Sequence, residues 1–249
     1  MQLQPLNLDR SFWWAVGMLA AVVLTFEMTS LDLWVQDRLF DFERQTWLID
    51  KTEPVGKSLF YTGPKVVIIF IGVVMLAAAT LPHRWQRHLP GVLRSRHNTT
   101  VAFLSLALTP ALIGRSKAVT NMFCPSEIQR YGGTVKYVRL FETYPVGEKP
   151  AQQGRCFPAG HASGGFALFA LAGLASNRRG QLLGVATGLA VGSLMGFYQM
   201  AKGAHYLSHT LITALIAWVV FLALHTIAKM EAENSAFMAR VKTLVRRRA

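Results

Sequence analysis

The stretch KVVIIFIGVVMLAAATL, residues 65–81, decides the fold class, because no charged residue follows its first lysine. The hydrocarbon core of a bilayer is about 30 Å thick, and a helix needs roughly 17–25 mostly apolar residues to cross it. Across all 249 residues the chain is 52% hydrophobic and only 16% charged. The sequence therefore predicts an integral membrane protein.

Further apolar stretches predict an all-α polytopic bundle of about six transmembrane helices. Besides 65–81, the expected spans are 11–29, 99–114, 162–175, 181–200 and 208–228. The fourth has only the length of an ordinary buried helix, and its glycines and alanines are typical of close packing inside a bundle. The first lacks a basic start and a small-residue cleavage site, so we interpret it as a retained span. We expect residues 1–249 to form a single integral-membrane domain.

The basic residues outside the spans predict the orientation of a chain whose formal net charge is +13. Segment 82–98 has four arginines and no acid, the turn 177–181 has two more, and the tail 229–249 ends in KTLVRRRA. With six spans these segments share one side, which the positive-inside rule makes cytoplasmic. Both termini are then cytoplasmic, while the loop 115–161 and the turn 202–208 face outward. We expect a multi-pass protein of a bacterial-type inner (plasma) membrane, facing the periplasm with its polar motifs. No nucleic-acid partner is expected, because the cations lie on no soluble domain or arm.

Three polar clusters fall on the predicted outward side. They read RSKAVTNMFCP (115–125), GRCFPAGH (154–161) and YQMAKGAHYLSH (198–209). Cations and glycine N–H groups beside histidines indicate an anion site that also holds a nucleophile and a proton donor. The candidate cations are Arg115, Lys117, Arg155 and Lys202. There is no Walker-type glycine-rich loop, so a nucleotide donor is not indicated.

The clusters resemble the three motifs of the type 2 phosphatidic acid phosphatases, which read K-x6-R-P, P-S-G-H and S-R-x5-H-x3-D. The matching residues are Lys117 with Cys124 and Pro125, then PAGH at 158–161, then GAHYLSH at 203–209. The order, the spacing and the expected topology agree from the third to the sixth span. The resemblance implies a six-span membrane lipid phosphatase that needs no cofactor.

The resemblance also implies roles for individual residues. His205 becomes the nucleophile that attacks phosphorus, His161 the acid that protonates the leaving oxygen, and Lys117 a phosphate ligand. Gly160 precedes that acid at a helix start, where backbone N–H groups bind anions. We therefore count Gly160 among the expected substrate ligands.

Several motif positions depart from the family pattern. The two arginines are replaced by Cys124 and Gln199, the serine by Ala159, and the aspartate by His209. The anion site is thus short of positive charge. Lys202 and Arg155, together with Arg115, are the candidates to restore it, and Gln199 remains an expected substrate ligand.

His209 stands where the family has the aspartate that orients the nucleophile. A neutral histidine can accept the same hydrogen bond, but it supplies no negative charge. Either the enzyme is slower, or another acid takes that role, for which Glu127 and Glu142 in the outward loop are the candidates. An open zinc site built from His161, His205 and His209 is the alternative use of these side chains. The surrounding cations would repel a metal ion, so we expect none.

Cys124 and Cys156 are the only two cysteines, and both fall in the outward loop. In an oxidising compartment such cysteines can pair. The bridge would join the first motif to the second and stabilise the chain by roughly 3–4 kcal/mol. Two free buried thiols are the alternative.

The sequence therefore predicts a lipid phosphatase that acts at the outer headgroup level through a phosphohistidine. Its partners would be the bilayer and a lipid phosphate: polyprenyl diphosphate, lipid A phosphate, phosphatidylglycerophosphate or phosphatidate. The intervening loop 126–154 would cover the site or select the headgroup. A lipid phosphotransferase that uses the same site, or a non-catalytic lipid-binding or transport protein, is the alternative.

Overall fold

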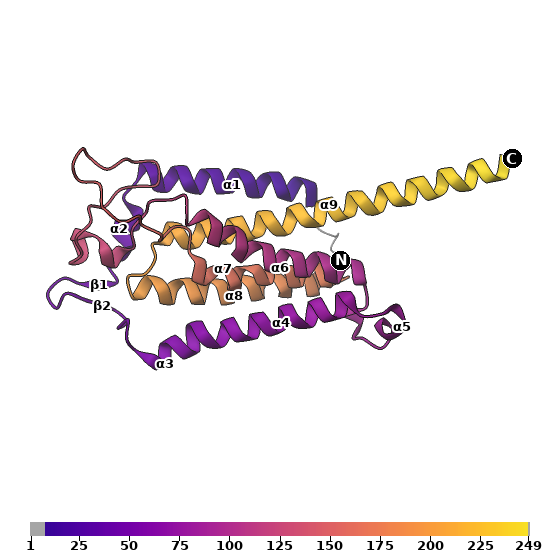
Figure 1. Cartoon of the computed structure of the whole chain (residues 1–249), viewed down its shortest axis with the longest axis horizontal. Coiled ribbons are helices and arrows are strands. Elements are labelled where there is room, and N and C mark those ends of the chain that lie inside the picture. Colours follow the sequence, from indigo (N-terminus) through magenta and orange to yellow (C-terminus); the bar gives the residue numbers. More distant parts are fainter. Residues whose placement is uncertain (1–7, 249) are drawn as a thin grey trace.

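A computed structural model of the chain describes the backbone of residues 8–248 and the side chains of residues 10–235, 237 and 238. Its long helices lie side by side in one elongated bundle, and the last extends well beyond the others (Figure 1). The main helices are α1 (Leu8–Met28), α4 (Gly63–Thr80), α6 (Arg96–Ser116), α7 (Gly160–Ala167), α8 (Arg178–Ala201) and α9 (Leu207–Arg248).

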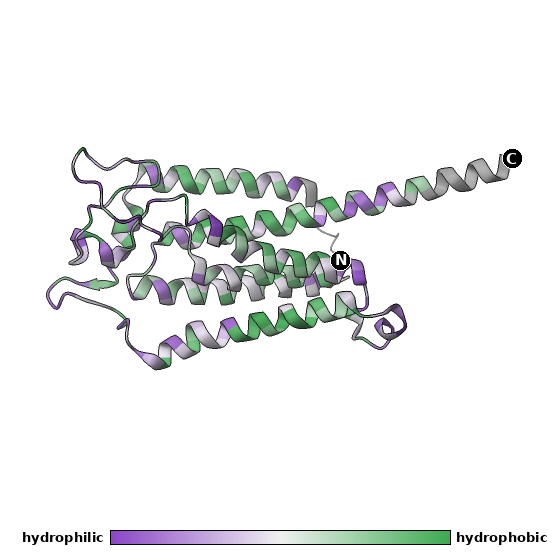
Figure 2. Cartoon of the chain, viewed as in Figure 1, coloured by the Kyte–Doolittle hydropathy of each residue, from purple (hydrophilic) through white to green (hydrophobic). Residues whose placement is uncertain are grey.

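The described residues contain five helices that are long and apolar enough to cross a membrane. These are Arg10–Met28, Pro54–Thr80, Arg96–Ser116, Arg178–Ala201 and Leu207–Ser235. A shorter apolar helical segment, Gly160–Leu174, consists of α7 followed directly by the 3₁₀ segment η5 (Leu168–Leu174). Apolar residues predominate along the bundled helices, and polar residues gather at the ends of the bundle (Figure 2). The all-α polytopic fold is confirmed, with the fourth expected span shorter than the rest.

The second span begins at Pro54 rather than near Lys65. The short helix α3 (Pro54–Lys57) continues through the π-helical turn η1 (Ser58–Thr62) into α4. Its start is capped by Glu53, whose carboxylate accepts hydrogen bonds from the N–H groups of Val55 (2.9 Å) and Gly56. Proline at the first helical position suits this cap, because its missing N–H would have no partner there.

The short fourth helix is held in the bundle by close backbone packing against α8. A Cβ added to Gly165 would lie 2.6 Å from the Cα of Gly192, and one added to Gly188 would lie 2.6 Å from Phe169. Only glycine permits such an approach, as expected for helix contacts inside a membrane bundle. This packing fixes the position of the N-terminus of α7.

Loops and short elements gather at one end of the bundle, which we call the loop end (Figure 1). They include α2 (Leu31–Gln36), the antiparallel strands β1 (Phe40–Asp41) and β2 (Thr46–Trp47), and the 3₁₀ turns η3 (Pro125–Glu127) and η4 (Gln129–Tyr131). Tyr131 packs its ring against Phe40 and Trp47, and Arg130 forms a 2.7 Å ion pair with Asp37. The segment 31–57 and the loop 115–161 thus cover the loop end together.

The opposite end carries the basic connections. It includes α5 (His83–Gln86), η2 (Gly91–Leu93) and the far part of α9 (Figure 1). Arg96 donates hydrogen bonds to the carbonyls of Ala79 and Leu81, both at 2.8 Å, and so satisfies the C-terminus of α4. Most side chains of the expected basic tail 229–249 lie outside the described residues.

Candidate active site

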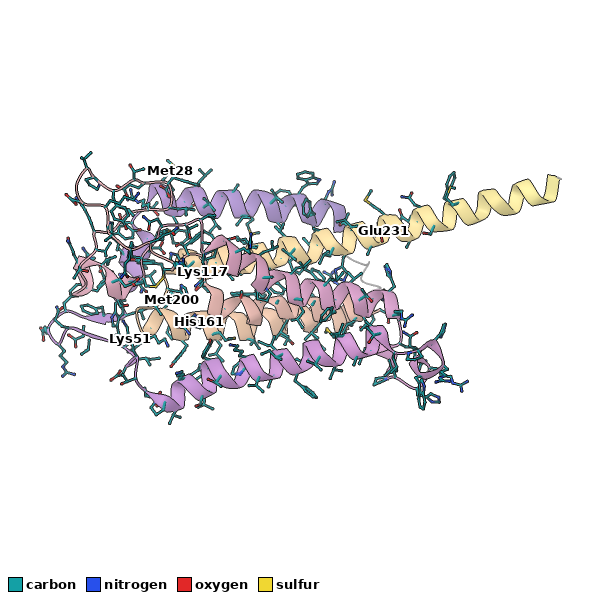
Figure 3. The ribbon with its side chains drawn as sticks, viewed as in Figure 1. Met28, Lys51, Lys117, His161, Met200 and Glu231 are labelled. Carbon is teal, nitrogen blue, oxygen red and sulfur yellow. A yellow bond between two sulfur atoms is a disulfide. The ribbon has the colours of Figure 1, made fainter. Side chains whose placement is uncertain are left out.

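The three sequence motifs meet at the loop end. Lys117 directly follows α6, His161 is the second residue of α7, His205 lies in the turn between α8 and α9, and His209 is in the first turn of α9. Helix α7 packs against α6, α8 and α9, which brings these helix ends together. Figure 3 labels Lys117 and His161 at this end of the bundle.

Three histidines form a row with His205 in the middle. The Nδ1 atoms of His205 and His209 are 3.4 Å apart, within hydrogen-bond distance. On the other side, the ring centroid of His161 lies 5.7 Å from that of His205. His205 and His209 are buried, with 2% and 0% of their surface exposed. The arrangement isolates His205 from bulk water and fixes one side of its ring.

The contact between the two Nδ1 atoms limits the tautomers. One nitrogen must donate and the other accept, because two neutral rings share one bond. When His205 donates, its Nε2 keeps a free lone pair. His209 then accepts at Nδ1, and its own Nε2 is buried without a hydrogen-bond partner among the described residues. The pair therefore presents a neutral His205 with a nucleophilic Nε2 when His209 serves as acceptor.

The two glutamates considered as replacement acids are engaged elsewhere. Glu127 accepts a 2.6 Å hydrogen bond from the N–H of Cys124, and Glu142 accepts a 3.0 Å bond from the N–H of Arg139. Both bonds organise the loop. Within the described part of the chain, the orienting contact to His205 Nδ1 thus comes from His209 rather than from a carboxylate.

Burial and neighbouring positive groups keep His205 neutral. Desolvation lowers the pKa of His205 well below its ordinary value, and His209, Lys117 and His161 lower it further. Burial also lowers the pKa of Lys117. The Lys117 side chain crosses Gly160 so closely that an added Cβ there would lie 3.0 Å from Lys117 Cε and 3.2 Å from Nζ. The glycine of the second motif thus leaves room for the lysine of the first.

The start of α9 is anchored by Asp32, a residue of α2. Its carboxylate accepts hydrogen bonds from the N–H of Ser208 at 2.8 Å and from the Ser208 hydroxyl at 2.5 Å. Ser208 lies between His205 and His209, so Asp32 fixes the segment that carries both. Burial raises the pKa of Asp32 to about 6, against the opposing effect of these hydrogen bonds.

A disulfide joins the first motif to the second. Cys124 and Cys156 are bridged, with their Cα atoms 5.1 Å apart. The sulfur of Cys156 lies 3.5 Å from His205 Nδ1 and 3.0 Å from the carbonyl oxygen of Ala204. The N–H of Cys156 also donates to the carbonyl of Met122 at 2.9 Å. The bridge therefore packs directly against the central histidine.

The residues do not fit a zinc site. A sulfur atom of Cys156 and nitrogen atoms of His205 and His209 lie within 4.8 Å of one another, and they are the only such cluster among the described side chains. That sulfur belongs to the disulfide, so it is not the thiolate that zinc requires. His161 does not join the cluster, and Lys117 adds positive charge beside it.

Two cavities open beside His161. The first, of about 350 Å³, is called the lateral cavity, and its lining includes Lys65, Ile68, Ile69, Pro110, Lys117 and His161. The second, of about 390 Å³, is called the outward cavity, and its lining includes Lys51, Glu127, His161, Gln199 and Lys202. His161 is thus common to both linings. The expected ligands divide between the two cavities, with Lys117 and Gly160 in the lateral one and Gln199 and Lys202 in the outward one.

Two of the expected cations lie outside the linings of both cavities. Arg115 and Arg155 are exposed, and neither belongs to the lining of the lateral or outward cavity. Two lysines outside the motifs line these cavities. Lys51 reaches the outward cavity because the N–H of Ile49 donates to the carbonyl of Ala201 at 3.0 Å, and Lys65 comes from α4.

Sequence reasoning missed both lysines, since one lies in a loop without a motif and the other opens an apolar run. The capped helix start at Glu53 and Pro54 was the available signal for Lys65. It would have placed this lysine well inside the second span, where a charge is costly and suggests a functional site.

The comparison with known families finds a match that covers the three motifs. The model of the PAP2 superfamily matches residues 98–233, more than half of the chain. The chain belongs to the PAP2 superfamily. Members of the PAP2 superfamily are phosphatases that act on phosphate esters, so the family supports a phosphoric ester hydrolase. The matched range includes all three histidines and Lys117, whereas Lys51 and Lys65 lie before it. No curated protein and no solved structure matches the chain.

Proposed function

We propose that this single integral-membrane domain is a lipid phosphatase that transfers the phosphate of a membrane-lipid phosphoester or diphosphate first to His205 and then to water. The observation that carries the proposal is the row of histidines. His205 is buried, neutral and oriented through Nδ1 by His209, and it lies beside His161 and the half-buried Lys117. A nucleophile held by a second group and backed by a proton donor is the arrangement that covalent catalysis needs.

The reaction would proceed in two steps. His205 Nε2 attacks phosphorus, the bond to the lipid oxygen breaks, and His161 donates a proton to that oxygen. The negative charge of a bound phosphate favours the protonated form of His161 that this step requires. Water then attacks the phosphohistidine, His161 accepts the proton, and orthophosphate leaves. Lys117 and Lys202 neutralise the phosphate, which takes the place of metal-ion catalysis.

The lateral cavity supports a lipid substrate. It combines apolar side chains of α4 and α6, such as Ile68, Ile69 and Pro110, with the cationic ends of Lys65 and Lys117. The acyl or prenyl chain of a membrane lipid already lies in an apolar environment, so these side chains would contact it through van der Waals packing. A lipid would therefore fit with its chain against these helices and its phosphate toward His161.

The orientation of the protein follows from the two ends of the bundle. The motifs lie at the loop end, while arginine-rich connections lie at the other. By the positive-inside rule the basic end would be cytoplasmic, together with both termini. The active site would then face the periplasm of a bacterial-type inner membrane, where the Cys124–Cys156 bridge is chemically favoured.

The test is release of phosphate by purified protein in detergent with EDTA. Polyprenyl diphosphate, phosphatidate, phosphatidylglycerophosphate and lipid A phosphate form the substrate panel, and His205→Ala is the test variant. His225→Ala is a matched control, because His225 is also a half-buried α9 histidine, bonded at 2.8 Å to the Phe221 carbonyl. EDTA-resistant release that is lost only in His205→Ala supports the proposal. Folded wild-type protein that releases no phosphate from any of these lipids contradicts hydrolysis, and phosphate transfer to a second lipid would then be measured.

A further inference from the structure

A third cavity lies at the other end of the bundle from the row of histidines. Its volume is about 460 Å³, larger than that of the lateral or the outward cavity. It lies where the first turns of α6 and α8 meet the end of η5 and the middle of α9, at the end of the bundle that also carries α5 (Figure 1). We call it the basic-end cavity.

The basic-end cavity has an apolar floor and a polar rim. The rim includes three exposed side chains, His97 and Asn98 from the first turn of α6 and Lys229 from α9. The floor is formed by buried apolar residues, namely Val101, Ala172, Phe221 and Ala228. This combination suits an amphiphile that has both an apolar part and an anionic head.

The rim is electrostatically positive. Helices α6 and α8 both begin here, so the positive ends of two helix dipoles lie beside the cavity. Among the described lining residues there is no aspartate or glutamate. The nearest acid to Lys229 is Glu233, with its Oε1 4.0 Å from Nζ, and both side chains are exposed. Such a surface pair contributes little, so a bound anion can replace it.

Buried polar atoms around the cavity have no partner in the helix packing. Oε1 of Gln181 and Nε2 of His225 are buried without a hydrogen-bond partner among the described side chains. The Nδ1–H of His225 donates to the carbonyl of Phe221 at 2.8 Å, and a Cβ added to Gly173 would clash with its Nε2. His225 therefore forms a wall of the cavity that holds α9 against η5. Polar side chains inside a membrane bundle are costly, and their presence indicates a polar ligand rather than simple helix packing.

The depth of the cavity matches the headgroup layer of a bilayer. His97 is the second residue of the candidate span Arg96–Ser116, and Lys229 lies near the end of the span Leu207–Ser235. The ends of membrane spans lie where the hydrocarbon core meets the headgroups. Basic pockets between membrane helices at this level bind acidic lipid headgroups.

We propose that the basic-end cavity binds an anionic phospholipid from the leaflet at the basic end of the bundle. Its phosphate lies between Lys229 and His97, and the first part of one chain covers the apolar floor. The amides of Asn98 and Gln181 provide hydrogen bonds for hydroxyl groups of the head. The lipid joins α6, α8 and α9 at the end opposite to the histidines and takes part in no reaction there.

The experiment measures thermal unfolding of the full-length protein in detergent micelles. The micelles contain phosphatidylglycerol, or phosphatidylcholine with the same chains, or the soluble anion glycerol 3-phosphate. Phosphatidylglycerol should raise the Tm of wild type by about 4 °C or more, because a ligand that binds only the folded state stabilises it. The other two additives should raise it by less than about 1 °C. Native mass spectrometry should show phosphatidylglycerol retained on the protein.

The test variant is His97→Gln/Lys229→Gln, which should lose more than about half of the shift caused by phosphatidylglycerol. Both side chains are exposed, so the fold should tolerate these substitutions. Arg84→Gln/His88→Gln is the matched control, because it removes the same residue types from exposed positions at the same end, outside the cavity. The control should keep the full shift.

Four results would overturn the inference. They are the absence of a shift and of retained phosphatidylglycerol in wild type, an equal loss in both double variants, an equal shift with phosphatidylcholine, and an equal shift with glycerol 3-phosphate. The second would indicate general charge attraction, the third contact with the lipid chains alone, and the fourth a site for soluble anions. The outcome is independent of the proposed phosphatase function, because no hydrolysis is measured.

Discussion

Replacing both bridged cysteines by serine should lower stability and activity together. The bridge joins residues 32 positions apart. In the chain-entropy model, a closed loop of about this length lowers the entropy of the unfolded chain enough to stabilise the fold by about 3.7 kcal/mol at 25 °C. For a chain of this size the corresponding decrease in Tm is roughly 10 °C.

The expected effect on activity follows from the contact between the disulfide and His205. The sulfur of Cys156 lies 3.5 Å from His205 Nδ1, on the side of the ring that His209 orients. Without the bridge, the segment before His161 is less constrained, and misplacement by about 1 Å can slow catalysis by up to 10²-fold. We expect kcat to fall about tenfold or more, with a smaller change in KM.

The assay combines thermal unfolding in detergent with turnover of a lipid phosphate. Wild type is measured with and without dithiothreitol, and the Cys124→Ser/Cys156→Ser variant is measured in parallel. Reduction should bring wild type to the Tm and kcat of the double variant and should leave the double variant unchanged. An identical Tm and kcat for oxidised and reduced wild type, with thiol titration showing complete reduction, would refute the reasoning.

Three smaller predictions concern the same site. Gly160→Ala should lower kcat/KM about tenfold, because the added Cβ would displace Lys117. Gly164→Ala is the control: its Cβ would lie 3.6 Å from its nearest neighbour, Ile68, so kcat/KM should change less than about twofold. Equal effects of the two substitutions would contradict the packing argument. His209→Asp should raise kcat, because a carboxylate accepts the same hydrogen bond and stabilises the imidazolium form, and an unchanged or lower kcat in a folded variant counts against the orienting role. The pKa of Asp32 is about 6 in the folded protein and 3.8 in the unfolded chain, so its stabilising contribution is present below pH 4 and lost as pH rises through 6. The Tm of wild type, measured relative to that of Asp32→Asn, should therefore fall over that pH interval. A Tm difference that does not change with pH would contradict the raised pKa of Asp32.

The fold was largely predictable from the sequence because membrane spans depend on local composition. The uncharged run after Lys65 identified its helix without tertiary information, and the glycines of 162–175 correctly indicated close packing. The start of the second span was wrong by about three turns, because Lys57 and the polar residues around it conceal the continuation of the helix from Pro54. The cap at Glu53 was the local signal for that continuation.

The candidate site was predictable only where it lies in motifs. His161, His205 and Lys117 were found through their spacing and resemblance, and the structure brings them together. Lys51 and Asp32 reach the site through long-range contacts, one through the Ile49–Ala201 backbone hydrogen bond and the other through Ser208. Such contacts leave no periodic pattern in the sequence, so only the folded chain reveals these residues.

The most direct test of the account is to trap the phosphoenzyme. Protein is mixed with a lipid phosphate labelled with ³²P in its terminal phosphate, quenched within the first turnover at alkaline pH, and digested for mass spectrometry. The account predicts a base-stable, acid-labile phosphohistidine at His205, present with EDTA and absent from His205→Ala. Rapid release of orthophosphate with no labelled histidine, or with the label on His161 or His209, would contradict it.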